Sequence, residues 1–225
     1  MMAGQAHVST LLLRNVPLFA MLPEPQLAVL TSVVSRRSFP RGATIILAGE
    51  TTDSLYVVIS GRLKVQMSDH EGREVILAIL GAGEYFGEMG LIDDSPRSAS
   101  VITLEPCELI GLSKHDFMRC LSDNFEMSTM VMRGLVKRLR EADGKISNLA
   151  LMDVYGRVAR LLLDMAETVN GEKIIARKVA KQDIAKMIGA SREMVSRVMK
   201  DLKSSGFMEV RDGKIVLRDK ISVID

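Results

Sequence analysis

A stretch of sixteen residues, FGEMGLIDDSPRSASV at positions 86–101, combines residue types that can hold a small anion. Gly87 and Glu88 lie near its start, and Arg97 and Ser98 follow after two aspartates and a proline. A glycine-rich turn into a short helix offers backbone N–H groups, and an arginine adds a forked, charge-assisted contact to a phosphate. The carboxylate can accept a ribose hydroxyl. The stretch therefore has the groups that a cyclic nucleotide would need.

An ordinary surface turn is the alternative for this stretch. Asp, Pro, Ser and Gly are common turn residues, and a salt bridge between Glu88 and Arg97 would tie such a loop. Under the anion hypothesis, the Ser98 hydroxyl and the Ala99 amide complete the donors around the phosphate. We also count as ligand-binding the two neighbours of the Gly-Glu pair, Phe86 and Met89.

A second set of polar residues shares one face of a helix predicted near the C-terminus. The apolar face of that helix carries Val195, Val198, Met199 and Leu202. The opposite face carries Arg192, Glu193, Ser196, Arg197 and Lys200. A guanidinium can read guanine O6 and N7, and a carboxylate can accept from a cytosine amino group. Ser191 is expected to cap the helix and to touch a phosphate.

The charge around this helix is strongly positive. Residues 177–203 contain eight basic and three acidic residues, although the whole chain carries a formal charge of only +2. Lys178, Lys181 and Lys186 would supply non-specific attraction to a polyanion. A solvated helical face or a protein-binding winged helix is the alternative, but the shape and the charge together favour DNA.

Short runs rich in β-branched residues predict a small antiparallel barrel or roll of six to eight strands between Arg37 and Leu112. The runs are TIILAG, LYVVISG, LKVQMS, EVILAIL, SASVITL and CELIGLS. Before them we expect a short helix, a turn marked by proline, and a second helix that begins at Pro25.

The pattern changes to a helical one near Asp123. A heptad seam follows at Ser128, Met132, Leu135, Leu139, Ala142, Ile146 and Leu149. One helix cannot bury this stripe alone, so the seam predicts either packing on the barrel or, as we prefer, a two-fold homodimer through residues 128–149. After Asp153 the pattern predicts a helix-turn-helix with a β-wing, in which FMEV and KIVL pair across Arg211-Asp212-Gly213.

Composition limits the other functions. The chain of 225 residues has two cysteines, Cys107 and Cys120, and three scattered histidines, His7, His70 and His115, so we expect no metal site or haem. No apolar run is long enough to span a bilayer and no signal peptide is evident, which predicts a cytoplasmic protein. No nucleophile–base motif or P-loop is present, so we expect no enzyme activity.

Three segments resemble one known family. GEMGLIDDSPRSASV resembles the phosphate-binding cassette of cyclic-nucleotide-binding domains, and KQDIAKMIGASREMVSRVMKDLKSSG resembles the DNA-binding helices of the CRP/FNR family. ISNLALMDVYGRVARLLLDMA is similar to that family's hinge region. The resemblance implies an α+β protein: a jelly-roll-like β-roll domain with N-terminal helices (1–122), a dimerisation helix and hinge (123–152), and a winged helix-turn-helix domain (153–225).

The resemblance also implies roles for individual residues. It assigns the ribose hydroxyl to Gly87 and Glu88, the cyclic phosphate to Arg97 and Ser98, and an approach to the nucleotide to Arg138 of the dimer helix. Positions that line the pocket from the barrel side match Val65 and Leu77. For DNA, the base-reading positions match Arg192, Glu193 and Arg197, the backbone-contacting positions match Lys181 and Ser191, and we add Gln182 and Lys200.

The chain departs from the family where its cAMP-responsive members contact the adenine base. Those members place Thr and Ser on the dimer helix, where this chain has Ala142 and Asp143, and they have a serine at the position of Ala78. Asp143 can accept the N1–H and N2–H₂ donors of a guanine. Cyclic di-GMP or cyclic GMP is therefore a rival to cAMP, unless Asp143 is merely solvated or salt-bridged.

The sequence thus predicts a dimeric transcription regulator that binds a palindromic operator in double-stranded DNA. We expect cAMP as the effector, with cyclic di-GMP or cyclic GMP as the alternative and binding of DNA without any ligand as a further one. The nucleotide is expected to change the packing of the dimer helix and to extend or rotate it through residues 149–154. The resemblance also implies RNA polymerase as a partner.

Overall fold

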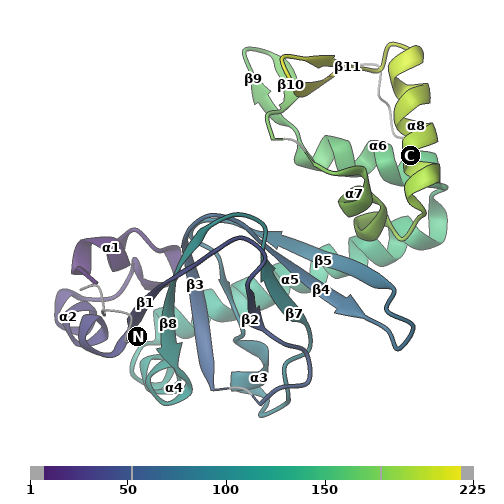
Figure 1. The fold of residues 1–225 in the computed structure, drawn as a ribbon. Helices are drawn as coiled ribbons and strands as arrows, with labels where there is room; N and C mark the ends of the chain where they lie inside the picture. The colour runs from purple at the N-terminus through teal and green to yellow at the C-terminus, as the bar shows by residue number, and fades with distance from the viewer. Residues whose placement is uncertain (1–7, 52, 178, 219–225) are drawn as a thin grey trace. The chain divides into compact units, whose positions relative to one another are not determined.

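The computed structural model describes residues 8–51, 53–177 and 179–218 (Figure 1). The chain forms two compact units, residues 1–138 and 139–225, and the boundary between them falls inside the long helix α5 (Phe125–Leu151). The residues predicted to bind DNA lie in the second unit, and those predicted to bind the nucleotide lie in the first, except Ala142 and Asp143, which belong to the second.

In its described residues the first unit is built on two four-stranded antiparallel sheets, which agrees with the antiparallel barrel or roll of six to eight strands that the β-branched runs predicted. The sheet orders are β1-β8-β3-β6 and β2-β7-β4-β5. The strands are β1 (Ser35–Phe39), β2 (Thr44–Ile46), β3 (Ser54–Ser60), β4 (Leu63–Ser68), β5 (Glu74–Leu80), β6 (Tyr85–Phe86), β7 (Ser100–Thr103) and β8 (Cys107–Ser113). The sequence runs had not indicated β1 or β6.

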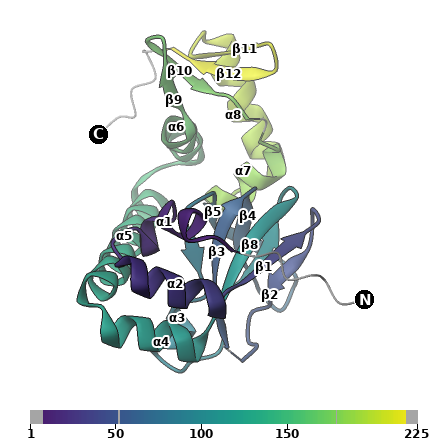
Figure 2. The ribbon, with the colours of Figure 1, turned by 90° about the vertical axis from the view of Figure 1, so that its left-hand side faces the viewer.

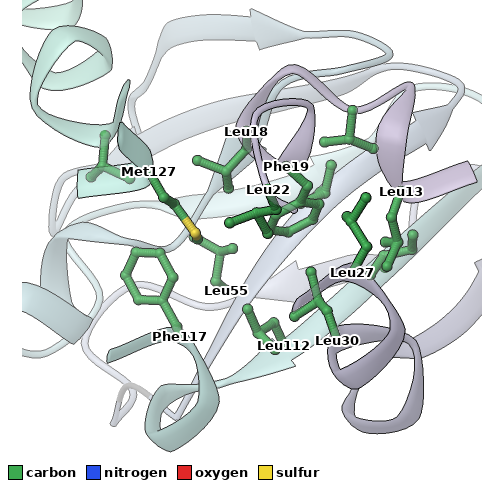
Figure 3. Packing of buried hydrophobic residues seen from close by; sticks show 14 of the residues in the cluster. Leu13, Leu18, Phe19, Leu22, Leu27, Leu30, Leu55, Leu112, Phe117 and Met127 are labelled. Atoms are coloured by element: carbon green, nitrogen blue, oxygen red, sulfur yellow. The ribbon is translucent and has the colours of Figure 1, made fainter. Parts of the chain in front are cut away.

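Helices cover one side of this roll. They are α1 (Thr10–Arg14), the 3₁₀ helix η1 (Pro17–Phe19), α2 (Glu24–Val33), α4 (Lys114–Asp123) and the start of α5, while the short α3 (Met89–Ile92) follows β6. Figure 3 shows Phe19, Leu55, Phe117 and Met127 packed together; each is buried. Helix α2 begins at Glu24, one residue before the predicted Pro25, because proline suits the first turn of a helix, where its missing N–H has no partner to lose.

Helix α5 has one apolar face on the roll and another exposed. Met127 and Val131 are buried in the core of the first unit, and Leu135 packs against the same core. The predicted seam positions Met132 and Leu139 are 53% and 62% exposed. Leu135 therefore belongs to the roll-facing side more than to the exposed stripe.

In its described residues the second unit contains the end of α5, three further helices and one sheet, and Figure 2 shows the sheet with these three helices beneath it. The elements are α6 (Val154–Met165), β9 (Glu167–Val169), β10 (Glu172–Ile175), α7 (Lys181–Ile188), α8 (Arg192–Ser204), β11 (Met208–Arg211) and β12 (Lys214–Leu217), with the sheet order β11-β12-β10-β9. The predicted wing hairpin is confirmed as β11 and β12. The hairpin β9–β10 was missed.

Both cysteines lie in the first unit. Cys107 is buried and Cys120 is half-buried, and burial raises the pKa of both thiols, which disfavours their thiolate forms. Within residues 8–51, 53–177 and 179–218, no group of His, Cys, Asp and Glu side chains is placed to hold a metal ion. In the same residues no helix combines the length and apolar character needed to cross a bilayer. His7 lies outside the described residues.

Candidate functional site

The carboxylate of Glu88 is the most unusual group in the first unit. Glu88 follows β6 at the start of α3, and its side chain has no exposed surface. Its Oε1 pairs with the guanidinium of Arg138, which comes from α5. Its Oε2 is buried without a hydrogen-bond partner among the residues that the structure describes. Such an atom is costly to bury, so Oε2 is an acceptor ready for a hydroxyl donor.

The guanidinium of Arg97 lies beside the same turn. Arg97 is 8% exposed, its Nη1 donates to the carbonyl oxygen of Gly87 at 2.8 Å, and its Nη2 donates to that of Ser54 at 2.7 Å. The exposed carboxylate of Asp53 lies 3.7 Å from Nη2. Burial lowers the pKa of Arg97, and the nearby Asp53 opposes that shift. A guanidinium with five N–H donors keeps capacity for an anion beyond these two carbonyls.

These contacts bear on the salt bridge that the surface-turn alternative invoked. Glu88 forms its ion pair with Arg138, whereas Arg97 is fixed by backbone carbonyls. The simple salt bridge between Glu88 and Arg97 is therefore not how the loop is held. The acid and the arginine each have a different partner.

Gly87 makes this arrangement possible. Its φ of +87° lies in the region that side chains disfavour, and a Cβ atom there would stand 2.5 Å from Nη1 of Arg97 and 3.1 Å from the carbonyl oxygen of Ser54. Only glycine lets the guanidinium come this close to the backbone.

The other residues predicted to bind ligand lie in varied surroundings. Val65 is half-buried on β4 and packs against the roll's second core cluster, and the buried Phe86 stacks on Tyr56 with ring centroids 5.5 Å apart. Leu77, Met89 and Ser98 are exposed, whereas Ala99 is buried. Ala142 and Asp143 belong to the second unit, where both are exposed, and their role stays a prediction.

Sequence reasoning missed Tyr85. Its carbonyl oxygen accepts a hydrogen bond from Nη2 of Arg138, and the Arg138 guanidinium lies over its ring, 5.0 Å from the centroid. Burial raises the pKa of the Tyr85 phenol, and Glu88 adds to the shift while Arg138 opposes it. No motif marks this residue; the aromatic side chain just before the Phe-Gly-Glu step was the only available signal.

In the second unit, helices α7 and α8 form the predicted helix-turn-helix. Gly189 ends α7 in the left-handed conformation with φ +63°, and the Ser191 hydroxyl accepts from the Met194 N–H at 3.2 Å to cap α8. The pKa of the Glu193 carboxyl is lowered by its own backbone N–H and by Ser191. Glu193 is therefore held as an anion at the start of the helix.

The two faces of α8 are divided as predicted. Val195, Val198, Met199 and Leu202 are buried in the core of this unit. The residues predicted to bind DNA are all exposed: Lys181, Gln182, Ser191, Arg192, Glu193, Arg197 and Lys200. Nζ of Lys181 donates to the hydroxyl of Ser196 at 2.9 Å, which joins the first helix of the motif to the second. Lys178 lies outside the described residues.

Comparison with known proteins matches both units. Residues 36–124 match the family model of the cyclic nucleotide-binding domain, and residues 156–220 match that of the Crp-like helix-turn-helix domain. The chain is 37% identical over 183 residues to the cAMP-activated global transcriptional regulator CRP of Haemophilus influenzae, covering 80% of this chain and 82% of that protein. It is 31% identical over 197 residues to the CRP-like cAMP-activated global transcriptional regulator of Mycobacterium tuberculosis, covering 86% and 88%.

The name of one similar solved structure mentions a different cyclic nucleotide. The c-di-GMP responsive global regulator CLP of Xanthomonas campestris is similar to this chain with a TM-score of 0.75 and 28% identity, covering 88% of this chain and all of that one. Similar proteins thus carry names with two different cyclic nucleotides.

Replacing Gly87 with alanine tests the close approach of Arg97. Gly42 is a matched control, because it has a φ of +80° and no atom lies within 4 Å of the place that a methyl group would take there. Both substitutions strain the backbone, but only Gly87→Ala also displaces a buried guanidinium. We expect it to lower the free energy of unfolding by about 1–3 kcal/mol more than Gly42→Ala, measured by urea unfolding with circular dichroism. Equal losses would contradict this close packing.

Proposed function

This chain belongs to the CRP/FNR family of cyclic-nucleotide-binding, DNA-binding transcription regulators, and we propose that it is a dimer whose affinity for its operator is set by a cyclic nucleotide at Glu88 and Arg97. The observation that carries the proposal is the buried Oε2 of Glu88, an acceptor without a hydrogen-bond partner in the described part of the chain. Beside it lies a buried arginine. A ribose hydroxyl and a cyclic phosphate are the donor and the anion that fit this pair.

The nucleotide would be held by groups with separate tasks. Oε2 of Glu88 accepts from the ribose 2′-OH, and Arg97 faces the phosphate with the Ser98 hydroxyl and the Ala99 amide. Arg138 pairs with Glu88 and orients it, because a buried carboxylate without a partner is unfavourable away from water. Val65, Leu77, Phe86 and Met89 supply apolar surface for the remainder of the ligand.

For the base, we propose cAMP as the effector. The curated relatives at 31–37% identity are named as cAMP-activated, which favours it. Cyclic di-GMP is the second candidate, because a similar structure carries that name and because Ala142 and Asp143 replace the hydroxyls of cAMP-responsive members. Asp143 would then accept from a guanine edge. Cyclic GMP satisfies the same acceptor.

The exposed stripe on α5 supports a homodimer. Met132, Leu139, Ile146 and Leu149 are each more than half exposed, although a stripe of large apolar residues is normally covered. A second copy of the same helix covers it by the heptad pattern. Two copies of α8 would then read a palindromic operator, with the half-sites about one turn of DNA apart. We propose RNA polymerase as a further partner and the cytoplasm as the location.

The nucleotide acts in this scheme as an effector and leaves unchanged. It favours one arrangement of the dimer only by binding that arrangement more tightly. A protein that bound its operator equally with and without nucleotide would be the ligand-independent regulator, and one that consumed the nucleotide would be an enzyme.

Calorimetric titration with cAMP, cyclic GMP and cyclic di-GMP identifies the effector and tests the role of Arg97. We expect one of them to bind the wild-type protein, and Arg97→Ala to weaken that binding about 10- to 100-fold through loss of charge-assisted hydrogen bonds. Arg97→Lys keeps the charge but loses the fork, and should also bind weakly.

The matched control for this titration is Arg62→Ala, because Arg62 is a half-buried arginine of the same unit that pairs with Glu105. It should bind like the wild-type protein. Full affinity in a folded Arg97→Ala protein would place the ligand elsewhere.

Arg197 and Lys200, two of the basic residues on the exposed face of α8, should differ in their effects on DNA. Arg197→Ala should reduce discrimination between the operator and a sequence with one changed guanine by about 1–3 kcal/mol, because base contacts specify. Lys200→Ala should weaken binding to all sequences equally and lower the salt slope by about one, because phosphate contacts position. Fluorescence anisotropy at several salt concentrations measures both. If Arg197→Ala weakened every sequence alike, a base-reading role for Arg197 would be excluded.

A further inference from the structure

Tyr85 touches three positions of α5 that lie on one face of that helix. Its hydroxyl donates to the carbonyl oxygen of Val131 at 3.5 Å, and its carbonyl oxygen accepts from Arg138, whose guanidinium also covers its ring at 5.0 Å. Gly134 lies between these two positions. Residues 131, 134 and 138 are spaced by three and four, so one side chain from β6 spans two turns of α5.

Gly134 is the counterpart of Tyr85 on the helix. A Cβ atom at Gly134 would overlap the Tyr85 hydroxyl oxygen and would stand 3.2 Å from its Cζ. Glycine is a poor helix former, so its presence in the middle of α5 calls for a local reason. The other glycine of this helix, Gly144, has no atom within 4 Å of the same position. At Gly134 the close approach of Tyr85 leaves no space for a side chain.

We propose that Tyr85 is a positioning residue, seated on Gly134, that orients Arg138 toward Glu88 and fixes α5 at one rotational setting on the β-roll. The proposal rests on the proposed function, since Glu88 is the group that would meet the ribose. Arg138 has three contacts in this region, to the Glu88 carboxylate, the Tyr85 carbonyl and the Tyr85 ring, and two of the three come from Tyr85.

The orientation of Arg138 matters because Glu88 is fully buried. A buried ion pair is favourable only when its geometry is good, so a guanidinium free to turn away would leave the carboxylate uncompensated. A hydroxyl that donates to Oε2 of Glu88 binds the same carboxylate that pairs with Arg138. Because Tyr85 contacts both Arg138 and Val131, a shift of this carboxylate would move residues 131–138 of α5 together.

Steric rescue provides the test. Gly134→Ala should push Tyr85 away, weaken binding of the effector at least tenfold in calorimetry with cAMP or cyclic di-GMP, and speed amide hydrogen exchange over residues 127–138 of the ligand-free protein. Tyr85→Phe removes only the hydroxyl, so its affinity should stay within about threefold of wild type. The double variant Tyr85→Phe/Gly134→Ala removes the overlapping oxygen but keeps the ring carbon Cζ, 3.2 Å from the new methyl group, so it should return both readouts most of the way to those of Tyr85→Phe.

Gly144→Ala is the matched control, because it makes the same change on the same helix in open space. It should leave affinity and exchange over residues 127–138 as in the wild-type protein. The proposal is overturned if Gly134→Ala behaves like Gly144→Ala, or if the double variant is no better than Gly134→Ala. An alanine that destabilised α5 for a reason other than this overlap would not be rescued by deleting the Tyr85 hydroxyl.

The exchange readout separates this proposal from the proposed function. If the wild-type protein binds none of the three cyclic nucleotides, the proposed function fails, but exchange in the ligand-free variants still shows whether Tyr85 holds α5. If the wild-type protein binds a nucleotide and the rescue is absent, the proposed function stands and the role of Tyr85 is wrong.

Discussion

A single buried carboxylate constrains the first unit. Glu88 has no exposed surface, so its charge needs a partner supplied by the protein, and that partner comes from 50 positions further along the chain. Arg138 lies on α5, so the ion pair that Glu88 needs connects the turn containing Glu88 to this long helix. In the proposed function, a ligand that satisfies the second oxygen of Glu88 would act directly on this ion pair. Such a ligand would thereby link binding to the position of α5.

Arg97 meets a different requirement in the same turn. Its charge is also removed from water, but backbone carbonyls hold it in place, and Gly87 provides the space. Because Glu88 and Arg97 have separate partners, they do not pair with each other in this turn. An acceptor and a cation are the groups that the proposed ribose phosphate would need.

A feature could be predicted from the sequence when the residues that form it lie close together in the chain. The Gly87-Glu88 and Arg97-Ser98 steps and the two faces of α8 are readable because their residues are close in sequence. Arg138 was available only through family resemblance. The contact of Tyr85 with Gly134 joins distant segments and leaves no local pattern.

The missed strands have physical reasons of their own. β1, with the sequence SRRSF, is an edge strand whose charged residues hide the usual alternation. The hairpin β9–β10 was available in principle, because Asn170-Gly171 is a strong turn signal and both residues have positive φ. Its strands of three and four residues are too short to show a period of their own.

The most direct measurement of the central claim is operator affinity, determined by fluorescence anisotropy with and without saturating effector. The proteins to compare are the wild type and Glu88→Gln, which preserves the shape of the side chain but removes its charge. The account predicts that the effector raises wild-type affinity at least tenfold and leaves that of Glu88→Gln unchanged; an equal response in the two proteins would contradict it.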